Sequence, residues 1–477
     1  MSLKEKAISG LIWTFAQQFG HQLIGFIVSV ILARILLPAE FGLIGMISIF
    51  FGVGMVLLDG GLTQSLIRSK ELDEDDYSTV FFFNLFASFV IYVIIYISAP
   101  LIGNFYDQPI LITVIRLYCL TFIISGFGAV QQARLTKNME FRVQALMTVP
   151  ATLIGGGVGV AMAYMGYGVF SLVWSQIVTS VISVSQLWFY TKWMPNLTFN
   201  FTKFKDHFNY GYKLTLSNLL NKIFQNLYII IIGKYFSAAQ VGFYTRADST
   251  TKLPVTNISN ALNKVTFPMF AAIQEDNVRL KRVYRQLMQM VVFVIAPILI
   301  LMAVLAEPIF RFLFTEKWLP AVPYFQILCI SGILHPVHTY NLNVLKVKGR
   351  SDLFLKISII NKVITIIGII IGIQFGIFGL LYAQVIVSFT TFFLHAYYTD
   401  QFINYSAWEQ IKDLIPIILL SLLCGGIILY LDLLLVNYLD FFRIITGLTV
   451  GGGVYFLLAW IFKFNSIGDL RKIVLKK

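Results

Sequence analysis

The chain has 477 residues, of which 58% are hydrophobic and only 12% are charged, and its mean hydropathy is +0.79. About 25% of the residues of a soluble globular protein are charged, so this composition excludes an ordinary soluble enzyme. The net charge of +13 would indicate nucleic acid as the partner of a soluble protein. In a chain this apolar, it instead raises the question of where the cations lie relative to a membrane.

Fourteen apolar runs bounded by charged residues, Pro or Gly predict transmembrane helices of about 20 residues each. The runs are continuous and do not alternate, which favours helices over the strands of a membrane barrel. The first run is longer than the roughly 7–15 apolar residues of a signal peptide, which predicts a retained span. In chain order, the runs cover residues 8–33, 41–66, 79–98, 110–132, 143–165, 169–191, 210–232, 242–266, 286–306, 322–345, 354–374, 379–399, 414–434 and 441–462.

The loops between these runs differ strongly in their content of Lys and Arg. With the N-terminus in the cytoplasm, 26 of the 36 cations fall on the cytoplasmic side and 6 on the other side. Because cytoplasmic loops are enriched in Lys and Arg, this bias predicts an even number of spans with both termini inside. The four remaining cations lie within predicted spans and are Arg116, Lys222, Lys252 and Lys362.

An internal repeat is predicted from matches between the two halves of the chain. The matches are Arg34 with Lys234, Glu40 with Gln240, Gly42 with Gly242, the polar residues at 17–22 with those at 217–222, and Gly166 with Gly376. They predict two six-helix lobes of parallel topology, residues 1–197 and 198–400, followed by a C-terminal helix pair, residues 401–477. Residues 192–213 combine lysines with phenylalanines, which indicates either an amphipathic cytoplasmic linker in the membrane interface or an ordinary loop.

Polar side chains form stripes on several predicted spans. On the first span they recur every three or four residues from Thr14 to Ser29, and on the seventh they run from Asn218 to Asn226. The eighth span adds Arg246, Asp248 and Lys252. Polar residues inside spans usually face a cavity, although Asn and Gln also join helices by hydrogen bonds. We expect the combined set to line a water-filled lumen between the two lobes.

Cations outnumber carboxylates in this polar set, so the lumen is expected to bind an anion such as phosphate or pyrophosphate. The predicted substrate-binding residues are Lys222, Lys252, Lys362, Arg246, Arg34, His21, Asn218 and Gln225, and the possible ion-coupling residues are Asp59 and Asp248. A structural ion pair of Asp248 with Arg246 or Lys252 is the alternative interpretation for that carboxylate. Sequence spacing alone predicts no local partner for Lys222 or Lys362, and Arg116 is expected to extend to the outer interface.

Several other patterns predict no further chemistry. The cysteines, Cys119, Cys329 and Cys424, are far apart in apolar runs and are expected to be reduced packing residues. His335 and His338 lie one turn apart without a nearby carboxylate, so no metal site is predicted. The run 73–76 is expected to cap the third span. The chain has no phosphate-binding loop motif and no long soluble loop, and we expect no cofactor, no metal and no nucleic-acid partner.

Four segments carry a family resemblance. The opening MSLKEKAISGLIWTFAQQ, the turn LARILLPAEFGLIGM, the segment DGGLTQSLIRSK and the later NMEFR resemble the polysaccharide transporter family. This family belongs to the multidrug/oligosaccharidyl-lipid/polysaccharide flippase superfamily, whose members share a fold typified by multidrug (MATE) exporters. The resemblance is to the colanic-acid and teichuronic-acid exporter branch, beside the Wzx-type flippases, and it extends over essentially the whole chain.

The resemblance implies a flippase of the bacterial inner membrane for undecaprenyl-pyrophosphate-linked oligosaccharide units, working by alternating access. Its implied partners are the anionic lipid-linked oligosaccharide, membrane lipids and proteins of polysaccharide polymerisation and assembly, and we expect a monomer. No residue roles transfer, because the family has no fixed catalytic signature. A cation-coupled multidrug exporter, a lipid II flippase and a membrane glycosyltransferase or acyltransferase are the alternatives, but an enzyme would need clustered His, Asp or Glu and large loops.

Overall fold

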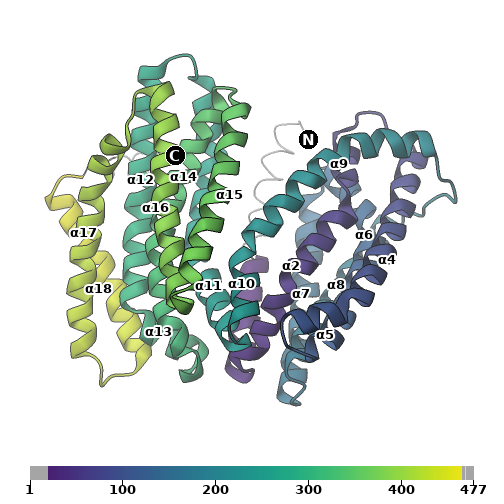
Figure 1. The fold of residues 1–477 in the computed structure, drawn as a ribbon, viewed down its shortest axis with the longest axis horizontal. Coiled ribbons are helices and arrows are strands. Elements are labelled where there is room, and N and C mark those ends of the chain that lie inside the picture. The colour runs from purple at the N-terminus through teal and green to yellow at the C-terminus, as the bar shows by residue number, and fades with distance from the viewer. Residues whose placement is uncertain (1–19, 465–467, 469–477) are drawn as a thin grey trace. The chain divides into compact units, whose positions relative to one another are not determined.

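A computed structural model describes residues 20–464 and residue 468 of the chain, and all the regular elements among them are helices (Figure 1). The chain forms two compact units, Met1–Gly242 and Phe243–Lys477. Helices that begin in the first unit are Gly20–Ile35, α2 (Pro38–Asp59), α3 (Leu62–Arg68), α4 (Glu74–Phe105), α5 (Ile110–Tyr118), α6 (Leu120–Lys137), α7 (Phe141–Tyr164), α8 (Val169–Thr191), α9 (Phe201–Gln225), α10 (Leu227–Tyr235) and α11 (Ala238–Ala272). The others are α12 (Asn277–Val304), α13 (Ala306–Phe314), the 3-10 helix η1 (Glu316–Ala321), α14 (Val322–Val347), α15 (Ser351–Ile373), α16 (Gly376–Ile403), α17 (Ala407–Leu434) and α18 (Asp440–Ile461).

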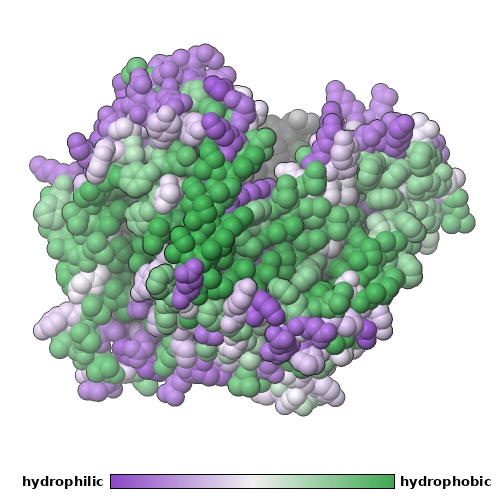
Figure 2. Space-filling view, in the orientation of Figure 1, coloured by the Kyte–Doolittle hydropathy of each residue, from purple (hydrophilic) through white to green (hydrophobic). Residues whose placement is uncertain are grey.

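Eleven of these helices, with α5–α6 and η1–α14 each counted as one, are long and apolar enough to cross a membrane. They coincide with eleven of the fourteen predicted spans. Large apolar side chains lie on the outside of both units, such as Leu101 (71% exposed), Phe189 (82%) and Trp460 (70%). Figure 2 shows this hydrophobic surface between groups of hydrophilic residues at the helix ends. The all-α prediction is confirmed, and the protein is a multi-pass membrane protein.

Polar residues at the helix starts explain where several helices begin. Asp73 is the N-cap of α4, where its carboxylate accepts from the backbone N–H groups of Asp75 and Asp76 while Asp76 returns a bond to the N–H of Asp73. Such caps satisfy backbone donors that have no partner within the helix. The Asn200 side chain caps α9 by accepting from two backbone N–H groups, without a returned bond. The predicted capping role of the acidic run is confirmed.

Tight helix pairs in each unit depend on glycine. A Cβ atom at Gly155 of α7 would lie 2.7 Å from the carbonyl oxygen of Ser175 on α8, and one at Gly372 of α15 would lie 2.8 Å from the carbonyl oxygen of Gly379 on α16. The turns before α8 and α16 place Gly166 at φ 83° and Gly376 at φ 73°, in a region that L-residues with side chains rarely adopt. The two glycines matched in the sequence thus occupy equivalent turn conformations.

The segment 192–213 differs from the prediction of a separate linker. Helix α9 begins at Phe201 and continues without a break into the region predicted as the seventh span, ending at Gln225. Phe204 and Phe208 on its first turns pack against Phe83 of α4, with ring centroids 4.8 and 6.4 Å apart. The linker and the span are therefore one helix, because the aromatic face finds a protein partner in the first unit.

Other predictions about the chain divide into confirmed and untested ones. All the cysteines are buried and free, as predicted. The division into lobes at residue 197 stays a prediction. The polar residues from Thr14 to Gln18, and the cations of the two tails before residue 20 and after residue 464, lie outside the described residues.

Candidate functional site

Most of the predicted site residues lie on the three predicted spans that are not among the eleven long apolar helices. Those spans correspond to Gly20–Ile35, to α9 with α10, and to α11. Asp59 at the end of α2 and Lys362 on α15 are the exceptions. Because a helix surrounded by lipid needs apolar side chains on every face, polar helices of this length must contact protein or water. Helices α9 and α11 are thus the candidates for a polar transport path, whereas Gly20–Ile35, the described part of the first span, is apolar.

In the first unit, Lys222 lies on α9 with its aliphatic stem against α2. A Cβ atom built at Gly52 of α2 would come 2.2 Å from Cε of Lys222, so the absence of a side chain there makes room for the lysine. The amide of Asn226 donates to the carbonyl oxygen of Lys222 at 2.8 Å and accepts from the Ser48 hydroxyl at 3.4 Å. The end of α9 is thereby held against α2, with the lysine half-buried.

The other predicted residues of the first unit are spread over several helices. Nδ1 of His21 lies 3.1 Å from the hydroxyl of Thr152 on α7. Arg34 is exposed at the end of its helix, and Asp59 is half-buried at the end of α2. Asn218 and Gln225 are exposed on α9. Roles for these residues in binding substrate stay predictions.

In the second unit, the structure joins two of the predicted residues directly. Nζ of Lys252 lies 2.7 Å from a carboxylate oxygen of Asp248, one turn away on α11. The lysine side chain is 58% exposed, whereas that of Asp248 is 18% exposed. The ion pair with Lys252, the alternative interpretation of this carboxylate, is present in the structure, and a role of Asp248 in ion coupling stays a prediction.

Arg246 and Lys362 are also in the second unit. The guanidinium of Arg246 is buried, with Cζ 4.8 Å from the ring centroid of Phe314 and 5.1 Å from that of Trp318. Cation–π contacts of this kind are strongest when the cation is removed from water. Contacts with the two aromatic rings therefore help to stabilise the buried guanidinium without any substrate. Lys362 is half-buried on α15.

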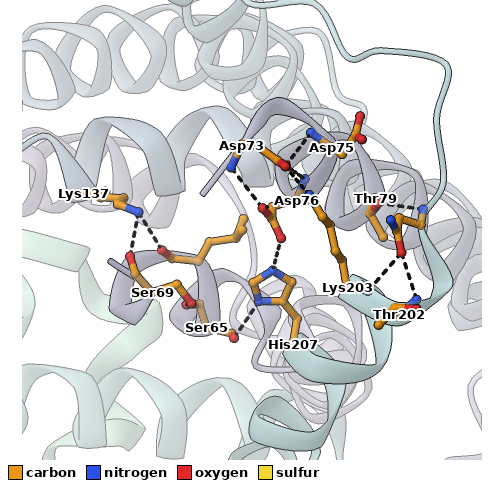
Figure 3. A network of polar contacts seen from close by, with 12 residues as sticks. Ser65, Ser69, Asp73, Asp75, Asp76, Thr79, Lys137, Thr202, Lys203 and His207 are labelled. Atoms are coloured by element: carbon orange, nitrogen blue, oxygen red, sulfur yellow. Dashed lines mark hydrogen bonds and ion pairs between the residues drawn. The ribbon is translucent and has the colours of Figure 1, made fainter. Parts of the chain in front are cut away.

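Sequence reasoning missed a polar network that fixes α9 to α3 and α4, shown in Figure 3. His207 on α9 is buried, with Nδ1 2.8 Å from the Ser65 hydroxyl and Nε2 3.2 Å from a carboxylate oxygen of Asp76. A neutral ring with the proton on Nε2 satisfies both partners, since it donates to the carboxylate and accepts from the hydroxyl. Lys203, one turn earlier, forms ion pairs with Asp73 and Asp76.

Close backbone packing and ion pairs also hold α9 against the first unit's α3 and α4. A Cβ atom at Gly61 would lie 2.5 Å from the carbonyl oxygen of Gly211 on α9, so the two backbones touch. The hydrogen bond from Lys203 holds the pKa of the Asp73 carboxyl well below its usual range, and the same bond raises the pKa of Lys203. The sequence shows the acidic run and the His207–Lys203 spacing, but nothing in it pairs residues about 130 positions apart.

Replacing His207 with alanine is expected to lower the free energy of unfolding by about 1–3 kcal/mol, because it leaves the buried Ser65 hydroxyl and the Asp76 carboxylate without this partner. The measurement is thermal unfolding of the purified protein. Lys205→Ala is the matched control, since Lys205 is exposed on the same helix two residues away. Equal melting temperatures for the two variants would show that the network does not stabilise the unit.

The described residues contain no group of three or more His, Cys, Asp or Glu side chains suited to a metal ion. Most of the predicted site residues carry a positive charge or a side-chain amide, and the two carboxylates among them are Asp59 and Asp248. Such groups can bind an anion by charge and hydrogen bonds.

The chain matches known proteins over most of its length. A family model described as polysaccharide biosynthesis protein matches residues 31–323. The chain is 26% identical over 354 residues to the teichuronic acid biosynthesis protein TuaB of Bacillus subtilis, covering 74% of this chain and 73% of that protein. It is 25% identical over 401 residues to the lipopolysaccharide biosynthesis protein WzxC of Escherichia coli, covering 83% and 82%.

Solved structures with the same fold are transporters. The lipid II flippase MurJ in an inward closed conformation superimposes with a TM-score of 0.75 at 16% identity, covering 96% of this chain and 100% of that chain. An inward-facing multidrug resistance transporter of the MATE family gives a TM-score of 0.60 at 15% identity, covering 81% and 96%. The predicted MATE-like fold is confirmed.

Proposed function

The chain belongs to the polysaccharide biosynthesis protein family, and from that premise we propose that it is a flippase for lipid-linked oligosaccharides. It moves undecaprenyl-pyrophosphate-linked repeat units across the bacterial inner membrane by alternating access, for the synthesis of a surface polysaccharide. The sequence relatives are named for teichuronic acid and lipopolysaccharide biosynthesis, which supports a saccharide precursor as the substrate. The protein is a transporter and not an enzyme.

We propose fourteen spans with both termini in the cytoplasm. The eleven apolar helices supply eleven of them, and the helix ending at Ile35, α9–α10 and α11 supply the other three. Of these, α9 and α11 carry the most polar side chains, as expected for helices that face a transport path. The excess of Lys and Arg in the loops assigned to the cytoplasm supports the orientation.

The observation that carries the proposal is the sign of the charge on the polar helices. Lys222 and Lys252 keep positive groups on α9 and α11, and Lys362 adds a third on α15. A pyrophosphate needs such cations once it leaves water. We propose that these lysines, with Arg246, Arg34, His21, Asn218 and Gln225, contact the head group, and that Asp59 and Asp248 serve ion coupling.

A multidrug exporter and a lipid II flippase are the alternative functions, and both have less support. A drug exporter for cationic compounds needs carboxylates in its binding site, whereas cations predominate on the polar helices here. The likeness to MurJ concerns the fold, and the sequence relatives named above are polysaccharide proteins. The proposed partners are the lipid-linked oligosaccharide, membrane lipids and polysaccharide assembly proteins, with the flippase acting as a monomer.

Replacing Lys222 or Lys252 with alanine is expected to reduce polymer export roughly tenfold or more, equivalent to a loss of at least about 1.4 kcal/mol of head-group binding. Export is measured as surface polymer in a strain whose own copy of the gene has been deleted, with membrane levels of each variant quantified. Gly52→Ala is expected to reduce export as well. The new methyl group would move the Lys222 side chain from its position, although the lysine and its positive charge are still present.

Lys213→Ala is the control, since Lys213 is exposed on α9 and is not a predicted site residue. Wild-type export by both lysine variants would contradict the cationic site. Resistance to ethidium or norfloxacin on overexpression, without restored export by the wild-type chain, would favour the drug exporter.

A further inference from the structure

An open cavity lies between α12, α17 and the end of α18, which pack side by side in the second unit (Figure 1). Its volume is about 290 Å³, and we call it the α17–α18 groove. It is lined by Lys412, Asp413 and Pro416 of α17, by Gln289 of α12, and by residues 462–464 at the end of α18. None of the residues proposed to contact the transported head group lies in it.

The turn that ends α18 holds a lysine where glycine is usual. Lys463 has φ 53°, a left-handed conformation that glycine commonly adopts just after a helix. The N–H of Phe464 donates to the carbonyl oxygen of Ala459 at 3.0 Å, which closes the turn. The ring of Phe464 packs against that of Phe293 on α12, with centroids 6.1 Å apart. The turn is therefore fixed at the wall of the groove, with a charged side chain kept at a position that suits glycine better.

The carboxylates near the groove are already paired with other cations. Asp413 accepts from the guanidinium of Arg285 on α12 and from the hydroxyl of Tyr405, the latter at 2.5 Å. Glu409, one turn earlier on α17, lies 2.7 Å from Nζ of Lys281. These carboxylates thus join the first turns of α12 and α17, and their negative charge is compensated there.

The two lysines of the groove are consequently left without a counter-charge. Lys412 and Lys463 are both exposed, and neither forms an ion pair with a carboxylate of the described residues. The side-chain amide of Gln289 adds a neutral hydrogen-bond donor to the same wall. The groove therefore has the charge and the donors that complement an anion.

The surface around the groove is that of a membrane interface. Trp408, 69% exposed, lies one turn before Lys412, and Phe462 is 64% exposed. Exposed aromatic rings and extended lysines are typical of the level of the lipid head groups. From Lys412 the same face of α17 continues with the exposed apolar side chains of Ile415 and Leu419. The groove is thus polar at its mouth and continues into a surface that suits acyl chains.

We propose that the α17–α18 groove binds the phosphodiester head group of an anionic phospholipid, whose acyl chains lie along α17. Lys412 and Lys463 contact the phosphate, and Gln289 donates to an ester or glycerol oxygen. Basic pockets between helices at the cytoplasmic side commonly bind such head groups. The volume of about 290 Å³ is at the lower limit of small-molecule sites, which suits a head group whose chains remain in the lipid. The groove faces the cytoplasmic leaflet in the proposed orientation.

The C-terminal tail of the chain is the other possible occupant of the groove. Residues 465–477 contain four lysines and arginines and one acidic side chain, Asp469. A segment with this charge is repelled by Lys412 and Lys463. Clusters of cations next to a span also attract anionic lipids, so the composition of the tail favours a lipid in the groove.

The test is native mass spectrometry of the full chain, delipidated in detergent and titrated with palmitoyl-oleoyl phosphatidylglycerol. The double variant Lys412→Gln, Lys463→Gln is expected to weaken binding of the first lipid about tenfold or more, because two charge-assisted contacts are lost. The control Lys346→Gln, Lys356→Gln removes the same charge from exposed lysines of α14 and α15, and it is expected to leave this affinity nearly unchanged. Equal affinities of the wild type and the groove variant would overturn the site.

Lys463→Gly separates lipid binding from folding. Glycine adopts the left-handed conformation of residue 463 without strain, so the melting temperature of the lipid-free variant is expected to equal or exceed that of the wild type. The affinity for phosphatidylglycerol is expected to fall about threefold or more, because one ammonium group is lost. Wild-type affinity in this variant would contradict a role of Lys463 in the site.

The remaining arms distinguish the ligand. Phosphatidylcholine with the same acyl chains is expected to bind much more weakly, and glycerol phosphate is expected not to compete at concentrations at which phosphatidylglycerol saturates. Equal binding of phosphatidylcholine would overturn the anionic site, and competition by glycerol phosphate would assign the groove to a soluble phosphate ester instead. Retention of no phosphatidylglycerol by the wild type would leave the groove to the tail and would also overturn the proposal. These measurements do not involve export, so they decide the lipid site even if the proposed function fails.

Discussion

Replacing Gly42 or Gly242 with alanine is expected to abolish most of the folded protein. A Cβ atom at Gly42 would lie 1.7 Å from the carbonyl oxygen of Ala238, and one at Gly242 would lie 2.0 Å from that of Pro38. Both obstacles are backbone atoms, so no side-chain rotation relieves the overlap. Ordinary overpacking of a core costs about 1–3 kcal/mol, and an overlap with backbone is expected to cost more.

The measurement is the yield of monodisperse protein after extraction, together with its melting temperature. Gly157→Ala is the matched control, because a Cβ atom at Gly157 on α7 meets nothing within 4 Å. Alanine is a better helix former than glycine by about 1 kcal/mol, so this control should be neutral or slightly stabilising. Normal yield for Gly42→Ala would contradict the close approach of the two backbones.

This contact also bears on the predicted repeat. Gly42 contacts Ala238, and Gly242 contacts Pro38. Adding 200 to the residue numbers of the second contact's proline and of the first contact's glycine gives the partners of the other contact, so the two contacts are equivalent. A reciprocal contact is what two copies of one unit would make across a two-fold axis. The repeat stays a prediction, but its proposed register is the one in which these contacts correspond.

Replacing Arg443 with methionine is expected to lower the free energy of unfolding by about 3–5 kcal/mol, because it leaves a buried carboxylate without its partner. Nε and Nη2 of Arg443 on α18 lie 2.8 and 2.7 Å from the two carboxylate oxygens of Asp432 on α17. The side chains are only 4% and 9% exposed. Asp440 also accepts from Arg443 at 3.2 Å, and Arg311 remains as its second partner in the variant.

The double variant Arg443→Met, Asp432→Leu is expected to regain much of the lost stability, since neither charge is then buried alone. Thermal unfolding of the wild type, both single variants and the double variant gives the coupling energy of the pair. Arg350→Ala is the control, because Arg350 and Asp352 are 45% and 62% exposed, and exposed pairs contribute about 0–1 kcal/mol. Equal losses for Arg443→Met and Arg350→Ala would contradict the argument from burial.

The sequence predicted the helices well and their polar partners poorly. All eleven apolar helices fall on predicted spans, and the cap at Asp73 was visible in the acidic run. In contrast, the sequence placed the cation Lys362 inside a span, but only the structure showed that the neighbouring Asn361 bonds to His395. Lys252 was expected to bind substrate, and its ion pair with Asp248 was an alternative that spacing on one helix made available.

By itself, then, the sequence determined that the chain is a multi-pass helical membrane protein with cations on its polar helices. Such features are local, because each span must satisfy its backbone within about 20 apolar residues and each loop carries its own charge. Only the tertiary structure decided which polar groups meet, as in the pairs of His207 with Asp76, His338 with His395 and Arg443 with Asp432. Those meetings depend on how distant helices pack, and helical periodicity fixes the face on which a side chain lies but not the helix opposite it.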